Sequence, residues 1–379
     1  MKKIALTIIA GIILFTSCKE QKNNPANKSE IKKDSITATS FYKRFEGTIA
    51  GQPVVMHLHK NENKLHAGYY YKNTGGWLTL SADSFFGDSV LFTEYAAVYN
   101  FNNDTDADTL HPQLRCLLQH NMLTGTWLSK DKKISYPIDL KEAYPAGSYK
   151  FSFESYSDSV KAFPTKPESP MAQMDNSFVV CENNVWLNDE IKKILTYDSA
   201  MNFKDGFNKA KTNYFNEYKK ELPGENDTLD LQFMNYSRSQ NIYVRYNEKN
   251  FVILESEEYM YSGGVHGNYG SSFFCFDLNS KKQLKLSDII SADSITLQHL
   301  AEKYFRIQYN VRSALNEVLF ENHLPVNDNF YFNEKGIGFL YNPYEVASYA
   351  QGEINIFIPF QALQKFIKPG FISRMNISL

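Results

Sequence analysis

Alternating apolar and polar residues over 41–146 are the feature that most constrains how this chain can fold. Segments such as residues 45–49 and 54–58 repeat with a period of two and are separated by frequent glycines. This pattern is typical of short antiparallel strands. Two of the segments, 65–70 and 123–127, carry a glycine close to an aromatic residue, which indicates a bend with the ring facing the core. The sequence therefore predicts a β-rich domain over residues 41–146, either a small barrel or a sandwich.

Helical and strand periodicities are mixed after residue 147. Apolar residues at steps of three and four, from Phe203 to Tyr218, predict an amphipathic helix that ends at Pro223. Four segments alternate well enough to form an antiparallel sheet covered on one face: residues 229–234, 242–246, 251–261 and 353–358. Three further helices are expected around residues 297–304, 315–319 and 363–366. Because the strands are grouped apart from the helices, the predicted fold class is α+β.

The first 17 residues have the pattern of a secretory signal. Two lysines precede an apolar run, residues 4–15, which is too short to span a bilayer. The run ends in Phe15-Thr-Ser-Cys18, which resembles a lipobox, the cleavage site of lipoprotein signal peptidase, with Phe15 where leucine is usual. We expect residues 1–17 to be removed and Cys18 to carry a lipid that anchors the chain to a membrane. Ordinary secretion is the alternative.

Residues 18–40 are predicted to form a disordered tether, because they contain almost no apolar side chain that would offset the entropy of ordering. Lys19 follows the cysteine, in place of the aspartate that retains many lipoproteins at an inner membrane. The sequence therefore predicts a lipid-anchored protein of the cell envelope, by analogy on an outer membrane. It does not decide between the periplasmic side and the surface side.

The charge and the cysteines limit the partners. The net charge is −2, so the chain has no basic excess that would release counterions from a nucleic acid, and nucleic-acid binding is excluded. Cys116, Cys181 and Cys275 are far apart and odd in number, with no C-x-x-C pair. Their spacing is compatible with one disulfide or with three buried thiols. No cofactor is predicted, and the oligomeric state is left open.

Two groups of residues only weakly resemble metal sites. Three acidic residues alternate as in a calcium loop: Asp104, Asp106 and Asp108. The central glycine and the closing glutamate of an EF-hand are absent, so a solvated acidic loop is the favoured interpretation. His57 and His59 lie on one face of a predicted strand and could bind a metal together with His66. Solvent-facing histidines are the favoured interpretation here.

Three glycines surround one histidine directly after a predicted strand: Gly263, Gly264 and Gly267. Such spacing favours positive φ angles or a close backbone approach. Four roles are open for the histidine, His266: a general base, a ligand contact, a metal ligand, or a ring that bonds the tight turn, which is favoured. A triad with Ser262 and Asp277 is disfavoured because no nucleophile elbow surrounds the serine.

A second motif is a loop rich in aromatic residues, built from Asn342, Pro343, Tyr344, Glu345 and Tyr349. It lies just before the last predicted strand. Tyrosine presents a rigid, amphipathic surface that suits both protein interfaces and sugar stacking. The alternative is that these rings pack beneath their own loop.

In this order and spacing, the two motifs resemble those of the extracytoplasmic domain shared by RsiV-type anti-sigma factors and PdaC-type peptidoglycan deacetylases. That family shows a Gly-Gly-Ala-His-Gly turn and an Asn-Pro-Tyr-Glu-Ile-Ala-x-Tyr-Ala-x-Gly loop. Here Val265 replaces the alanine, and Ser348 stands where some members have proline. The resemblance covers residues 226–379 as a C-terminal domain and, more loosely, residues 147–225, which are similar to the smaller α+β domain that often precedes it.

What the resemblance implies is binding. In RsiV-type proteins the domain binds lysozyme as a sensor, and in PdaC-type enzymes it lies beside a separate deacetylase domain. We expect neither a deacetylase domain nor a sigma-binding segment here, and therefore a non-catalytic lipoprotein that binds a lysozyme-like glycosidase or the cell-wall glycan, peptidoglycan. The expected binding residues are Tyr344, Glu345, Tyr349, Pro343, Asn342, Tyr261 and His266. The alternatives are an envelope hydrolase or deacetylase centred on His266 and a structural or assembly lipoprotein.

Overall fold

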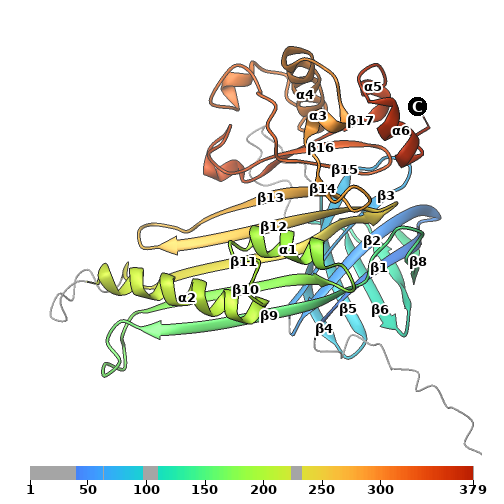
Figure 1. The fold of residues 1–379 in the computed structure, drawn as a ribbon. Helices are drawn as coiled ribbons and strands as arrows, with labels where there is room; N and C mark the ends of the chain where they lie inside the picture. The colour runs from blue at the N-terminus through green and yellow to red at the C-terminus, as the bar shows by residue number, and fades with distance from the viewer. Residues whose placement is uncertain (1–39, 63, 97–109, 223–232, 379) are drawn as a thin grey trace, which may run out of the picture. The chain divides into compact units, whose positions relative to one another are not determined.

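The structure, a computed structural model, describes residues 40–62, 64–96, 110–222 and 233–378 (Figure 1). The predicted signal peptide, the lipidation site Cys18 and the tether up to residue 39 lie outside these residues. So does the acidic loop of Asp104, Asp106 and Asp108. Within the described residues, no helix is both long and apolar enough to cross a membrane.

Eight antiparallel strands form a closed barrel, in which each strand pairs with the next and β1 pairs with β8. The strands are β1 (Ser40–Ile49), β2 (Gln52–Asn61), β3 (Lys64–Tyr71), β4 (Trp77–Phe86), β5 (Ser89–Ala96), β6 (Gln113–Gln119), β7 (Met122–Leu128) and β8 (Ser135–Glu142). Alternate residues such as Phe45, Met56 and Tyr69 are fully buried in one core, as a period of two requires. The predicted antiparallel β domain is confirmed, and its form is a barrel.

A six-stranded mixed sheet follows the barrel, in the order β14-β13-β12-β11-β10-β9. Its strands are β9 (Phe151–Lys161), β10 (Met171–Cys181), β11 (Tyr236–Glu248), β12 (Phe251–Ser262), β13 (Asn268–Asp277) and β14 (Lys282–Gln283). Neighbours are antiparallel except β10 and β11, which are parallel and therefore need a crossover connection. α1 (Val185–Ile194) and α2 (Phe203–Lys220) belong to that connection and pack on one face of the sheet. The predicted boundary between residues 225 and 226 thus falls between two paired strands.

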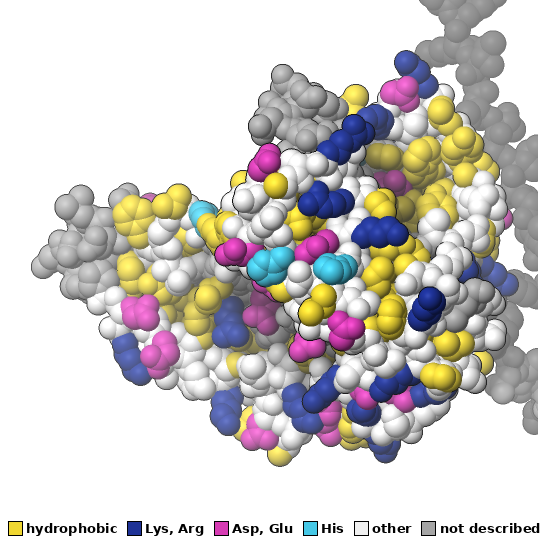
Figure 2. Space-filling view, turned by 90° about the horizontal axis from the view of Figure 1, so that it is seen from above, with side chains coloured by type: hydrophobic (Ala, Val, Ile, Leu, Met, Phe, Trp, Pro, Cys, Tyr) yellow, Lys and Arg dark blue, Asp and Glu magenta, His cyan; other side chains and the backbone are white. Residues whose placement is uncertain are grey.

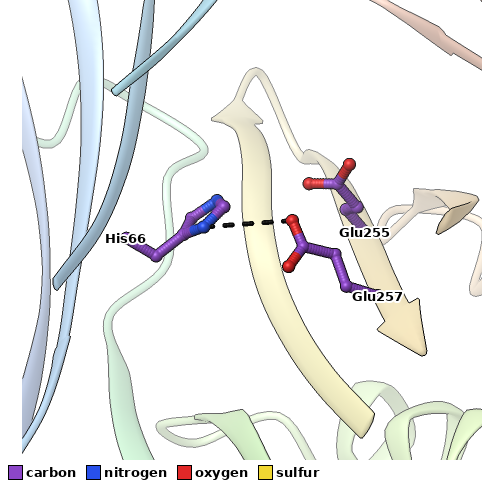
Figure 3. Close-up of side chains that lie close together, drawn as sticks. All are labelled: His66, Glu255 and Glu257. Atoms are coloured by element: carbon purple, nitrogen blue, oxygen red, sulfur yellow. Dashed lines mark ion pairs between the residues drawn. The ribbon is translucent and has the colours of Figure 1, made fainter. Parts of the chain in front are cut away.

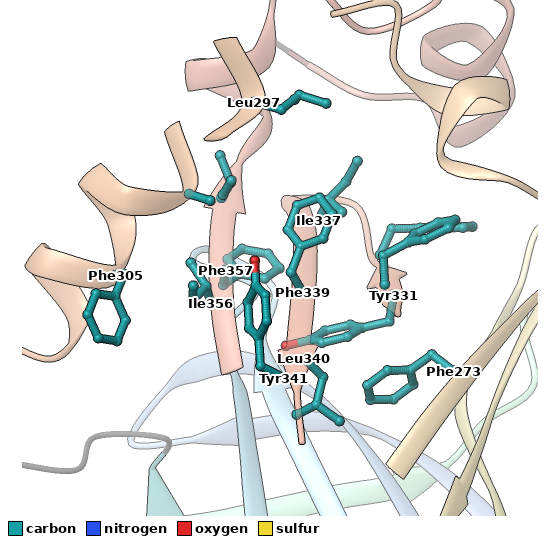
Figure 4. Close-up of a cluster of buried hydrophobic side chains, with 14 of the residues drawn as sticks. Phe273, Leu297, Phe305, Tyr331, Ile337, Phe339, Leu340, Tyr341, Ile356 and Phe357 are labelled. Carbon is teal, nitrogen blue, oxygen red and sulfur yellow. The ribbon is translucent and has the colours of Figure 1, made fainter. Parts of the chain in front are cut away.

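A small antiparallel sheet and short helices make up the carboxy-terminal part. The strands are β15 (Phe330–Phe332), β16 (Gly336–Tyr341) and β17 (Ile354–Pro359), with β16 in the middle. The helices are α3 (Leu286–Ile289), α4 (Ser294–Gln308), η2 (Leu315–Glu317), η3 (Tyr349–Gln351), α5 (Phe360–Leu363) and α6 (Pro369–Met375). Side chains from this sheet, from α4 and from β13, such as Phe339, Phe305 and Phe273, share one core (Figure 4). This core attaches the small sheet to the six-stranded one.

The α+β fold class and most elements predicted after residue 147 are confirmed. α2 corresponds to the helix predicted from Phe203 to Tyr218, α4 to the helix around residues 297–304, and β17 to the last predicted strand. The strand expected at residues 229–234 is only partly described. Residues 229–232 lie outside the described chain, and the two residues that follow them precede β11 without belonging to it.

The helix expected at residues 315–319 is wrong, because this segment forms only the 3₁₀ turn η2. No side chain caps the start of the turn. The backbone N–H of Phe320 bonds to the carbonyl of Val346 instead of continuing a helix. One uncapped turn does not offset the cost of helix nucleation, so the chain leaves the helical path.

The face of β2 that carries His57 and His59 is covered, not exposed. His59 Nε2 accepts a hydrogen bond of 3.0 Å from the backbone N–H of Val244 in β11, and Tyr42 Oη lies 3.0 Å from His57 Nδ1. Both rings are buried. Burial lowers the pKa of His59 to about 3 and the pKa of His57 well below its usual value, so both are neutral. The expectation of solvent-facing histidines is therefore wrong.

Polar contacts join the barrel to both sheets. The buried guanidinium of Arg44 pairs with Glu46 of its own strand and with Glu248 of β11, each at 2.7 Å. The side-chain amide of Asn333 donates to the carbonyl of Gly75 at 2.6 Å, from the small sheet to the barrel. Such charged and buried bonds are costly to break, so they define how the barrel contacts the sheets.

All three cysteines within the described chain are free and buried: Cys116, Cys181 and Cys275. This settles the alternative between one disulfide and three buried thiols in favour of thiols. Burial raises the pKa of Cys116 and of Cys181 to about 12. The thiols therefore stay protonated at neutral pH, which suits packing and not nucleophilic chemistry.

Candidate functional site

The two motifs singled out in the sequence lie against each other, although about 80 residues separate them. The ring of His266 stacks on that of Tyr349, with centroids 4.2 Å apart. Tyr349 Oη donates to the carbonyl of Gly267 at 3.0 Å, and Tyr344 Oη lies 3.4 Å from His266 Nε2. The glycine turn between β12 and β13 and the loop between β16 and β17 therefore form one surface.

The glycine turn needs glycine for two different reasons. Gly263 and Gly264 have φ angles of +88° and +95°, in the region that residues with a Cβ rarely adopt. Gly267 has an ordinary backbone but no room, because a Cβ there would lie 2.4 Å from Tyr259 Oη. Tyr261 Oη donates to the Gly264 carbonyl at 3.0 Å and closes the turn.

The second loop is held by its polar side chains. Asn342 bonds both backbone groups of Ser271 in β13, accepting at 2.7 Å and donating at 3.2 Å. Glu345 accepts from the Asn342 backbone and from the Asn327 side chain, each at 2.9 Å. Pro343 is buried. Asn342, Pro343 and Glu345 therefore shape the loop, and Glu345 is also exposed at its surface.

Tyr344 is presented by a strained backbone. Its φ angle is +68°, in the left-handed region, which costs on the order of 1–3 kcal/mol for a residue other than glycine. Its side chain is nevertheless 53% exposed. Since no burial of its own ring offsets the strain, the surrounding bonds maintain an outward-facing tyrosine. Strain of this kind often accompanies a functional loop.

Side chains of the two loops and of the adjoining strands form one exposed, mainly aromatic surface, which we call the tyrosine patch. It consists of Tyr261, Val265, His266, Tyr269, Tyr344 and Tyr349. Tyr269 and Tyr344 both contact Tyr349, with centroids 5.7 and 5.5 Å apart. Val265 is 100% exposed at the tip of the glycine turn. The rings thus support one another from the side and leave an apolar surface toward solvent.

The hydrogen bonds of His266 define its tautomer. A carbonyl oxygen can only accept, so the contact of 2.8 Å with Gly267 requires the proton on Nδ1. In the neutral ring, Nε2 then accepts from Tyr344 Oη. Within the described residues no carboxylate bonds this ring, and Asp277 of the disfavoured triad pairs instead with Arg374. The arrangement can orient a ring in a binding surface but lacks the partner that orients a general base.

A second cluster joins the barrel to β12, with His66 facing Glu255 and Glu257 (Figure 3). His66 Nδ1 lies 3.9 Å from Glu257 Oε1, and one ligand atom of each residue lies within 4.8 Å of the others. Arg245 Nη2 bonds Glu255 at 2.7 Å, so the cluster already contains a cation. Burial and the neighbouring Glu255 raise the pKa of Glu257 to about 8.

The metal set considered from sequence, His57, His59 and His66, does not converge on one point, although the rings of His59 and His66 lie side by side with centroids 6.0 Å apart. The first two rings bond the protein, as described above, and only His66 faces the acidic residues. The sequence interpretation missed Glu255 and Glu257, although their spacing of two residues on one predicted strand places both on the same face.

The face of the molecule seen from above carries Lys and Arg side chains interspersed with Asp and Glu side chains (Figure 2). No continuous basic stripe crosses this face. A polyanion would need such a stripe, so this face agrees with the small net charge of the sequence.

Comparison with known proteins relates a segment of the carboxy-terminal half to a described family. Residues 276–361 match the family described as "Protein of unknown function (DUF3298)". The chain is also 26% identical over 159 residues to peptidoglycan-N-acetylmuramic acid deacetylase PdaC from Bacillus subtilis strain 168. That match covers 40% of this chain and 34% of the relative, so the chain spans about a third of the length of the curated relative. The resemblance to PdaC-type proteins is confirmed.

One solved structure shares the fold over part of this chain. A crystal structure of a DUF3298 family member from Bacteroides fragilis NCTC 9343 superposes with a TM-score of 0.52 at 21% identity. The superposition covers 60% of this chain and 98% of that one. A DUF3298 protein from Pseudomonas aeruginosa PAO1 has a TM-score of 0.41 at 17% identity and covers 58% of this chain and 95% of its own.

Proposed function

Because the carboxy-terminal part of the chain carries a DUF3298 domain, related to that of a cell-envelope protein, we propose that this protein is a non-catalytic binding protein of the cell envelope. Its partner is a lysozyme-like glycosidase, which the tyrosine patch contacts. The observation that carries the proposal is the exposed and strained Tyr344, held on a stack of His266 and Tyr349.

The composition of the tyrosine patch suits a protein partner. Tyrosine is enriched among the residues that dominate protein interfaces, and a buried tyrosine often contributes 2 kcal/mol or more. Val265 protrudes fully exposed beside the rings. A protruding apolar side chain fits a hollow in another protein, whereas small-molecule sites are concave. The patch therefore favours a glycosidase protein over the glycan.

The tyrosine patch is also preorganised. Tyr344, Tyr349 and His266 are already bonded to one another and to the backbone, so few rotamers have to be fixed when a partner binds. Immobilising one such side chain costs about 0.5–1.5 kcal/mol. Rigid tyrosines that avoid this cost are typical of specific binding surfaces.

The membrane anchor is part of the same proposal. A lipid on Cys18 would hold the binding surface at the cell envelope, on an outer membrane by analogy with Lys19 after the cysteine. This part is supported by the sequence pattern alone, since both residues lie outside the described chain.

The proposal is tested by measuring binding of the purified protein to immobilised hen egg-white lysozyme and to peptidoglycan. We expect binding to lysozyme, and a loss of at least tenfold in the Tyr344→Ala variant. Tyr136→Ala is the matched control, because Tyr136 is 44% exposed on the barrel. Absence of binding to lysozyme, or an equal effect of both substitutions, would refute the proposal. Binding to peptidoglycan alone that the Tyr344→Ala substitution weakens would assign the patch to the glycan.

A further inference from the structure

A groove of about 950 Å³ lies on the six-stranded sheet, at its junction with the barrel. Ser177 and Asn241 line it, whereas their neighbours Phe178 and Ile242 are buried in the core under α1 and α2. Since side chains alternate along a strand, the groove lies on the face opposite the helices. Barrel residues such as Lys64 and His66 form one end of it. We call this feature the sheet groove.

The strand register lines up small polar side chains across the floor of the sheet groove. Ser155 in β9 lies opposite Ser177 in β10, which lies beside Asn241 in β11. Strands are about 4.8 Å apart, so this row extends about 10 Å across the sheet. Ser177 donates to the Asn241 side-chain oxygen, which leaves the Asn241 amide nitrogen available as a donor.

A second row lies two residues further along the strands. Ser157, Asp175 and Ser239 follow one another across β9, β10 and β11, and the row ends at Tyr259 in β12. Asp175 accepts from Ser157 and, at 2.8 Å, from Gln173 Nε2. The ring of Tyr259 is 40% exposed. The two parallel rows thus carry hydroxyl, amide and carboxylate groups, and the second row leads to an accessible aromatic ring.

The lining of the sheet groove excludes two classes of ligand. Its charged residues are balanced, with Glu62 and Asp175 against Lys64 and Arg238, so it offers no excess charge to a nucleic acid or another polyanion. Aliphatic side chains are scarce: Leu65 and Ala82 are at one end. An apolar peptide or a lipid chain would gain little from burial there.

We propose that the sheet groove binds an uncharged, extended oligosaccharide. Sugar hydroxyls both donate and accept, and so match side chains that do the same, such as Ser239 and Asn241. The apolar face of a sugar ring matches an exposed aromatic ring, here Tyr259. The pairwise bonds between floor residues hold the polar groups in place before a ligand arrives, which reduces the entropy lost on binding.

The inference is independent of the tyrosine patch, because Tyr344, Tyr349 and His266 do not line the sheet groove. Tyr259 borders both surfaces: it lines the groove and contacts Gly267. For this reason Tyr259 is left unchanged in the test. A protein that binds lysozyme but no hexasaccharide refutes the groove proposal alone. A protein that binds a hexasaccharide but not lysozyme refutes the proposed function alone.

The test titrates chitohexaose and cellohexaose into the purified protein by isothermal titration calorimetry. We expect at least one of the two hexasaccharides to bind, and Ser239→Trp, which fills the middle of the second row, to weaken binding at least tenfold. Asn241→Ala removes one donor and should weaken it about three- to tenfold. Ser135→Trp is the control, since Ser135 is an exposed strand serine on the barrel.

The two groove variants distinguish the possible results of the titration. Thermal denaturation shows whether the Ser239→Trp variant is folded. If it is not folded, the effect of Asn241→Ala on hexasaccharide binding decides the outcome. Lack of binding by both hexasaccharides, or binding that survives both groove substitutions, would overturn the inference. Unchanged lysozyme binding in the groove variants would show that the tyrosine patch is intact.

Discussion

The protein should lose stability as the pH rises from 5 to 8, and replacing Glu257 by glutamine should remove part of that loss. The pKa of this carboxyl is raised from 4.5 to about 8 by burial and by the neighbouring Glu255. Between these values the native state keeps a proton that the unfolded chain has lost. The free energy of unfolding therefore falls with rising pH.

The size of this pH effect follows from the one proton that the native state binds and the unfolded chain does not. A difference of one bound proton changes the free energy of unfolding by about 1.4 kcal/mol per pH unit. The Glu257 side chain is 35% exposed, and solvent weakens such interactions and so reduces the pKa shift, so we expect about half of the full effect, roughly 2 kcal/mol in total between pH 5 and 8. A glutamine cannot ionise, so the variant should lack this slope.

The assay is urea denaturation of both proteins at several pH values between 5 and 8. His66 and Glu353 also contribute to the pH dependence near this site, because burial lowers the pKa of His66 and raises the pKa of Glu353. They are present in both proteins, so the difference between the two curves isolates Glu257 to first order. Glu258→Gln on the same strand is the control, since Glu258 is exposed. If the wild type and the Glu257→Gln variant lose the same amount of stability as the pH rises, the reasoning is refuted.

Three other substitutions have defined outcomes. Gly267→Ala places a Cβ against Tyr259 and should cost about 1–3 kcal/mol of stability; thermal denaturation that is unchanged would contradict the close approach. His59→Phe removes the acceptor for the Val244 N–H and should destabilise by about 1–3 kcal/mol in urea denaturation; a neutral effect would show that this bond contributes nothing. Cys18→Ala should abolish palmitate labelling and release the chain from membranes; unchanged membrane retention would disprove the lipid anchor.

Local periodicity was sufficient to predict much of the fold. The alternation over residues 41–146 predicts strands because burial on one face of a strand leaves a period of two in the sequence. The apolar residues from Phe203 to Tyr218 predict α2 in the same way, because burial on one face of a helix leaves a period of 3.6. The 3₁₀ turn at Leu315–Glu317 could not be foreseen, because its end depends on a bond to Val346, which is distant along the chain.

The two motifs could be found because unusual residues cluster in them. Gly263 and Gly264 signal a backbone that only glycine adopts easily, and that signal is local. The contact between His266 and Tyr349 is not local, and neither motif contains information about the other's position. Sequence similarity to a family supplied the reason to consider them together.

By itself, the sequence determined the α+β class, the β-rich amino-terminal domain and the presence of two unusual loops, since each depends on residues that are neighbours along the chain. Only the tertiary structure decided that His57 and His59 are buried and that His66 faces Glu257. Alternation along a strand shows which side chains share a face, but it cannot show which other surface covers that face. Closure of the barrel and its packing against the sheet depend on contacts between distant segments, and these contacts also form the tyrosine patch and the sheet groove.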